Sequence, residues 1–163
     1  MIKNLLFSIV AIFSSSTIAQ NSIVGIYEDK VITLRQLESV SKENDSKDKK
    51  ISAIHALISE NIELDYIKKL QISPTSSSIN DELLNVAKLN NIKLDELKKF
   101  SNFDEIYSLV VLKLSKIGLR QIVVNQDRVE PISLTSKEGL TIFQDWLNNI
   151  KAKMYIEIYD EKL

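Results

Sequence analysis

The chain has few of the residues that cross-link a fold, bend it sharply or bind phosphate through the backbone. Its 163 residues include no cysteine, two prolines and three glycines. Without cysteine the chain can form neither a disulfide framework nor a thiolate metal site. Gly25, Gly118 and Gly139 are isolated from one another, whereas a loop that cradles phosphate needs clustered glycines. These absences exclude a disulfide-rich domain and leave no nucleotide-binding loop.

Histidine and unbalanced charge are scarce as well. The formal net charge is −1, so no basic field indicates a nucleic-acid partner. The single histidine, His55, falls in a predicted helix with no second metal ligand at helical spacing beside it. We interpret His55 as an ordinary helix residue and predict no catalytic residue, no metal and no cofactor. An enzyme stays open as a further alternative, with no residues assigned to it.

The first nineteen residues have the organisation of a secretory signal peptide. Lys3 gives a positive start, Leu5–Phe13 is an apolar run, and Thr17 with Ala19 suits cleavage after Ala19. An uncleaved anchor is the alternative, but spanning a bilayer takes about 20 apolar residues. No later segment is apolar enough to span, so we expect the mature chain to be soluble and outside the cytoplasm.

The rest of the composition suits one globular domain. Hydrophobic residues make up 44% of the chain and charged residues 26%, which is typical of folded proteins. A chain of this length buries roughly two-thirds of its unfolded surface, enough for a core. We predict a single domain over residues 20–163.

The most apolar stretch after the leader, residues 102–124, predicts one long helix on which the other segments pack. Asn102 and Glu105 have the spacing of a reciprocal capping box. At about 100° per residue, apolar side chains surround most of the circumference, and only Lys113, Lys116 and Arg120 form a polar strip. Such a helix needs protein on several sides. Alternatively, part of its surface is an open groove for an apolar partner.

The remaining pattern predicts a mainly α-helical domain with a small β-sheet. Strands are expected over residues 23–27, 31–33 and 154–159, and helices over 34–40, 51–70, 78–89 and 94–100, with a charged connector over 41–50. Ser78 with Asp81 predicts a capping box for the third helix, and Thr135 with Glu138 predicts one for the last helix. Asp81, Glu82, Asp104 and Glu105 are interpreted as charges favoured by helix N-termini. Two N-terminal strands are too few to be stable alone, so we predict that the C-terminal strand joins their sheet.

Three stretches occur in an order that is familiar from one protein family. They read IVGIYEDKVITLRQLE, then ISPTSSSINDELLNVAKLNNIKLDELKKF before the long helix, and finally DWLNNIKAKMYIEIYD. This order resembles the core of the SurA family, and AKLNNIKLDELKKF is the closest local match. The family consists of periplasmic chaperones of bacterial outer-membrane proteins, which also carry parvulin-type prolyl-isomerase domains.

The chain departs from the family pattern in two places. The family's hairpin turn usually carries Asn-Gly, whereas this chain has Glu28-Asp29-Lys30, so we expect a longer or less well formed turn. The parvulin domains normally precede the terminal helix, where this chain has only Asn125–Leu134. That segment is too short for such a domain, so the resemblance implies the chaperone core alone and no enzyme.

The resemblance and the apolar helix together lead to a functional prediction. We expect an ATP-independent periplasmic chaperone that binds unfolded outer-membrane β-barrel proteins, or other extended polypeptides, through an apolar cleft. Leu84, Tyr107, Val111 and Leu114 are the predicted client-binding residues. The alternative is a structural or adaptor subunit of an envelope complex that uses the same surface for one fixed partner.

Overall fold

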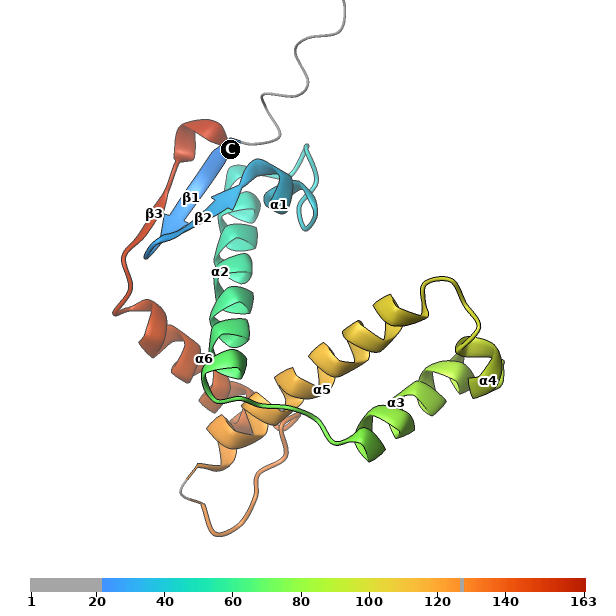
Figure 1. Ribbon diagram of the computed structural model, residues 1–163. Coiled ribbons are helices and arrows are strands. Elements are labelled where there is room, and N and C mark those ends of the chain that lie inside the picture. Colours follow the sequence, from blue (N-terminus) through green and yellow to red (C-terminus); the bar gives the residue numbers. More distant parts are fainter. Residues whose placement is uncertain (1–21, 127) are drawn as a thin grey trace, which may run out of the picture. The chain divides into compact units, whose positions relative to one another are not determined.

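The computed structural model describes residues 22–126 and 128–163. The predicted signal peptide and its cleavage site lie outside these residues. The described chain is mostly helical with one three-stranded antiparallel sheet, so the predicted fold class is confirmed (Figure 1). Its elements are β1 Ile23–Tyr27, β2 Lys30–Thr33, α1 Leu34–Glu38, α2 Lys47–Lys69, α3 Ser76–Leu89, α4 Leu94–Leu97, α5 Phe103–Asn125, α6 Lys137–Lys151, β3 Ile156–Ile158 and a 3-10 helix Asp160–Lys162.

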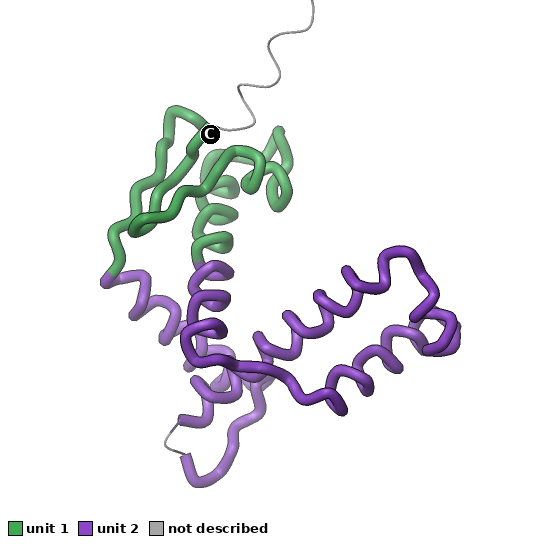
Figure 2. Tube along the Cα trace, in the orientation of Figure 1, with its two compact units in different colours: residues 1–58, 154–163 green, residues 59–153 purple. Residues whose placement is uncertain are grey.

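The chain divides into two compact units (Figure 2). The sheet unit contains the described residues up to 58 together with residues 154–163, and the helical unit contains residues 59–153. Helix α2 contributes its first half to the sheet unit and its second half to the helical unit.

The sheet unit joins segments from both ends of the described chain. Its strand order is β2-β1-β3, and both pairings are antiparallel. In the pairing of β1 with β3, Gly25 lies opposite Ile158 and Tyr27 lies opposite Ile156. The backbone N–H of Tyr159 donates to the carbonyl of Val24 at 3.0 Å and extends this pairing. The prediction that the C-terminal strand completes the N-terminal sheet is confirmed.

The turn between β1 and β2 contradicts the expectation of a longer loop. Tyr27 pairs directly with Lys30, so only Glu28 and Asp29 form the turn. Glu28 has a left-handed φ of 50°, which is unfavourable for a residue with a side chain. Two hydrogen bonds hold it: its backbone N–H donates to the carbonyl of Tyr155, and its carboxylate accepts from the N–H of Tyr155, both at 2.9 Å. The third strand therefore stabilises a turn that lacks glycine.

The core of the sheet unit lies between the sheet and the first half of α2. Its buried side chains are Val24, Tyr27, Ile32, Leu37, Ile54 and Ile58. Gly25 eases the pairing of β1 with β3, because a Cβ there would stand only 3.3 Å from the carbonyl oxygen of Glu157. The predicted start of α1 is confirmed, since Thr33 and Gln36 form a reciprocal capping box. Helix α2 starts at Lys47 and not at Ile51, because its charged first turn does not show in an apolar pattern.

Three predicted helix caps are wrong, although the helices themselves form. Thr75, and not Ser78, caps α3 by accepting a hydrogen bond from the backbone N–H of Ser78. Ser136, and not Thr135, caps α6. Asn102 precedes α5 but makes no side-chain cap, because its ψ of 22° departs from the extended backbone that a capping residue normally has.

Gly139 in the first turn of α6 provides a test of this fold. A Cβ at Gly139 would clash with the carbonyl oxygen of Ser133, and such overpacking typically costs about 1–3 kcal/mol. We expect Gly139→Ala to lower the free energy of unfolding by about that amount, measured by chemical denaturation. Thr141→Ala, at an exposed position of the same helix, is the control and should have little effect. A Gly139→Ala protein that is more stable, as an ordinary helix glycine would give, contradicts the close approach.

Candidate functional site

Helix α5 buries different faces in its two halves. Its first half packs on α3 and α4 around a cluster of buried residues, namely Ile79, Leu83, Ala87, Leu97 and Val110. Phe103, Ile106, Val111 and Leu114 of α5 pack against this cluster and are partly buried. At about 100° per residue, these four positions fall within a sector of about 140° around the helix axis, so they form one face of the helix. The first half of α5 therefore has one covered side.

The second half of α5 buries residues on two faces. Here the buried residues are Ser115, Leu119 and Val124. At about 100° per residue, Ser115 and Leu119 point about 140° and 180° away from Val110, whereas Val124 points only about 40° away from it. Within this half, Ile72 lies close to α5 at Gly118, where an added Cβ would stand 3.0 Å from it. The apolar circumference seen in the sequence thus results from two half-covered segments and not from a helix covered on all sides.

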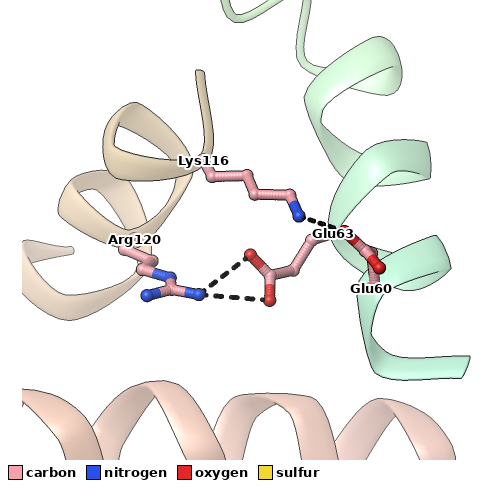
Figure 3. A network of polar contacts seen from close by, with 4 residues as sticks. All are labelled: Glu60, Glu63, Lys116 and Arg120. Atoms are coloured by element: carbon pink, nitrogen blue, oxygen red, sulfur yellow. Dashed lines mark hydrogen bonds and ion pairs between the residues drawn. The ribbon is translucent and has the colours of Figure 1, made fainter. Parts of the chain in front are cut away.

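The residues of the polar strip of α5 form ion pairs with neighbouring helices. Lys113 bonds Glu82 of α3 at 2.6 Å. Lys116 bonds Glu60 at 2.5 Å, and Arg120 bonds both carboxylate oxygens of Glu63 at 3.3 and 3.4 Å (Figure 3). The two glutamates belong to the second half of α2. The strip therefore serves as a row of interhelical ion pairs, a role that sequence spacing within one helix does not reveal.

The Arg120–Glu63 pair continues into an aromatic cluster. Glu63 is only 6% exposed, so its carboxylate depends on this partner. The guanidinium of Arg120 lies 5.0 Å from the ring centre of Phe143. Phe143 stacks on Trp146 at 5.4 Å, and Trp146 meets Tyr66 edge-on at 4.9 Å. Helices α2, α5 and α6 are thereby held together by charge and ring contacts.

The predicted client-binding residues lie on the α3–α5 pair. Glu82 and Lys113 meet on one flank of this helix pair. Leu84 is two positions after Glu82, and Val111 is two positions before Lys113. Each therefore points about 160° away from that charged residue, toward the other flank. Tyr107 lies on the same side of α5 as Val111 and is 41% exposed. Leu84 and Val111 are partly buried. The structure therefore groups Leu84, Tyr107 and Val111 on one flank.

The same side of α5 continues beyond the predicted residues. Tyr107, Val111, Leu114, Gly118 and Ile122 fall within a sector of about 80° around the helix axis. We call these five residues the α5 stripe. Leu114 is partly buried against α3 and Ile72 lies close to Gly118, whereas Ile122 is 49% exposed. Sequence reasoning missed Ile122, because an apolar pattern on all sides does not indicate which apolar residues remain uncovered.

The stripe is a surface and not a cavity. A hollow of about 240 Å³ lies instead in the sheet unit, where Leu34, Leu37 and Leu163 share its lining with charged residues of both signs. Within the residues that the structure describes, no group of three or more His, Asp or Glu side chains could hold a metal ion. No described helix is long and apolar enough to cross a membrane. His55 is exposed on α2.

The sequence matches no protein-family model and no curated protein.

The buried Glu63 carboxylate provides a test of the packing around α5. Arg120→Met removes its ion-pair partner, and an unsatisfied buried group costs about 1–3 kcal/mol. We expect the free energy of unfolding, followed by Trp146 fluorescence, to fall by this amount. Lys116→Met is the control, because exposed ion pairs contribute less than about 1 kcal/mol. Equal stability of the two variants contradicts a structural role of Arg120, and adding Glu63→Leu to Arg120→Met should restore part of the loss.

The Lys113–Glu82 pair predicts a pH-dependent contribution to stability. The hydrogen bond from Lys113 holds the pKa of Glu82 below its ordinary value of 4.5. A carboxyl whose pKa is lower in the folded state stabilises the fold above its unfolded pKa, and this contribution is lost as pH falls through the folded pKa. The difference in unfolding free energy between the natural protein and Lys113→Met should therefore be constant near neutral pH and shrink below about pH 4.5. A difference that stays the same at pH 3 contradicts the assignment.

Proposed function

We propose that the mature chain is an ATP-independent periplasmic chaperone that holds unfolded outer-membrane β-barrel proteins. Three observations support this. Residues 1–19 have the pattern of a secretory signal. The order of the segments resembles the SurA core. Two side chains of the α5 stripe, Tyr107 and Ile122, are exposed on the surface, and the stripe is the observation on which the proposal mainly depends.

The spacing of the stripe suits an extended client. Four residues of α-helix rise about 6 Å, while alternate residues of an extended strand are about 6.6 Å apart. An unfolded β-barrel segment lying along α5 can therefore place two successive apolar side chains near Tyr107 and Val111, which are four residues apart. Outward-facing positions of membrane β-strands are apolar at every second residue, so this spacing favours such segments over others.

The same geometry keeps binding weak and reversible. The stripe is open on one side and partly covered at Val111 and Leu114, so a client removes only part of each side chain from water. Burial contributes about 25 cal/mol per Å² of apolar surface, and association costs offset much of it. A holding chaperone needs this balance, because the client must leave without ATP.

Suppression of aggregation tests the proposal. We expect the chain from Gln20 onward, at several-fold molar excess, to slow the light scattering of a urea-unfolded outer-membrane β-barrel protein diluted into buffer. Tyr107→Ser combined with Ile122→Ser should weaken client binding about thirty-fold, since each change removes about 1 kcal/mol of apolar burial. No protection by the natural protein would overturn the proposal.

Leu109→Ser is the matched control for these variants. Leu109 is 59% exposed on the same helix, but it points about 160° away from Tyr107. Protection should survive this change. Equal loss in Leu109→Ser and in the stripe variant would show that the stripe is not the binding surface. A stoichiometric complex with one envelope protein, without protection of unrelated unfolded chains, would favour the adaptor alternative.

A further inference from the structure

The two edges of the sheet differ in how their backbone groups are used. The strand order β2-β1-β3 makes β2 and β3 the edge strands, and Figure 1 shows β3 on the side of the sheet away from α1. At the β2 edge, the backbone N–H of Thr33 donates to the side chain of Gln36 at 2.8 Å, so the start of α1 uses a donor of this strand. The β2 edge is therefore partly closed by the helix that follows it.

The register of β3 determines which of its backbone groups point outward. In an antiparallel pair, alternate residues hydrogen-bond to the neighbouring strand, and the residues between them direct their N–H and C=O groups away from it. The carbonyl of Tyr155 and the N–H of Tyr159 bond on the β1 side, so Ile156 and Ile158 direct their N–H and C=O groups to the free edge. Within residues 22–126 and 128–163, none of these four groups has a hydrogen-bond partner.

The side chains of the same two isoleucines lie where the cover on the sheet ends. Ile158 lies opposite Gly25 and Ile156 lies opposite Tyr27, so these four positions share one face of the sheet. A Cβ at Gly25 would stand 3.5 Å from Ile54 of α2, which identifies this as the face toward α2. Tyr27 is buried on this face, whereas both isoleucines are only half-buried. A further strand beside β3 would extend the same apolar face.

We propose that the β3 edge binds an extended polypeptide segment as a fourth, antiparallel strand. A partner residue opposite Ile156 or Ile158 exchanges hydrogen bonds with that isoleucine and places its own side chain beside it, on the face toward α2. The partner residue between them lies beside Glu157, which is exposed on the other face, and a polar side chain suits that position. The preferred partner therefore has apolar residues at alternate positions, as membrane β-strands do.

A second copy of β3 fits this edge less well than a different sequence does. The symmetric pairing of two copies that uses all four outward groups of each strand is centred on Glu157. It would place two glutamates directly opposite each other, and like charges at such positions are destabilising. The inference does not rest on the α5 stripe, because the stripe belongs to the helical unit and β3 belongs to the sheet unit.

Fluorescence anisotropy tests the proposal with the chain from Gln20 onward. The probe is a labelled peptide in which valine alternates with threonine or lysine, and we expect it to bind. In the proposed pairing the valine N–H groups face β3. N-methylation of two central valines should therefore weaken binding about twenty-five-fold, the product of two five-fold effects of a lost hydrogen bond. N-methylation of the two neighbouring threonines, whose N–H groups face away from β3, is the matched control and should leave binding unchanged.

Ile158→Pro tests the same hydrogen bonds from the side of the protein. It removes an outward N–H that β1 does not use, and proline is tolerated at such edge positions. We expect peptide binding to weaken about five-fold while the circular dichroism spectrum stays the same. Ile158→Val keeps both the N–H and a β-branched side chain, so it is the matched control and should bind as the natural protein does. Tyr107→Ser with Ile122→Ser should also bind the peptide normally.

Three results would overturn the proposed strand addition. One is no binding of the unmethylated peptide by the natural protein. Another is an equal effect of the two methylation patterns, which test the natural protein and so do not depend on the folding of any variant. The third is a dimer of the natural protein, seen by sedimentation velocity, that Ile158→Pro dissociates, because a second copy would then occupy the edge. Failure of client protection with intact peptide binding would contradict only the chaperone proposal.

Discussion

The helical unit depends on which of the apolar side chains around α5 are buried by neighbouring helices. One neighbouring helix can cover only one face of another, because helix–helix packing buries a stripe. In this chain α3 and α4 cover one face of the first half, and α6 packs along α5, whose Lys116 and Arg120 also pair with α2. Gly118 lies in the second half, where Ile72 passes close to the helix backbone. Tyr107 and Ile122 stay exposed at the two ends of the α5 stripe, because these contacts do not reach them.

Charge sets the register of this packing. Three cations of α5, at positions 113, 116 and 120, meet three glutamates of α2 and α3. Exposed pairs contribute little energy, but a misplaced helix would leave the buried carboxylate of Glu63 without its partner, which is costly. Arg120 also contacts Phe143, so the position of α6 depends on the same arginine. Apolar burial supplies the stability of the unit, and the ion pairs select one arrangement of its helices.

The sequence predicted most of the fold, because the elements have strong periodic patterns. Residues 102–124 indicated α5 to within a residue at each end. The alternation around Ile156 and Ile158 indicated a strand, which needs neighbouring strands for its backbone hydrogen bonds. The caps were less predictable. In the serine- and threonine-rich segments before α3 and α6, several side chains offer an oxygen, and the backbone conformation decides which one is used. Sequence placed Leu84, Tyr107 and Val111 on candidate surfaces, but exposure at Leu89, Leu109 and Ile122 depends on neighbours that are distant in the chain.

The two units differ in how their segments are distributed along the chain. All of the helical unit comes from one continuous stretch, residues 59–153, whereas the sheet unit needs β1 at residues 23–27 and β3 at residues 156–158. A chain emerging from its N-terminus therefore has every helical segment of the continuous unit available before the final strand appears. Until then β1 has only β2 beside it, and an isolated hairpin is barely stable. The sheet is thus completed only once residues 156–158 have emerged, and these residues decide when β1 becomes ordered.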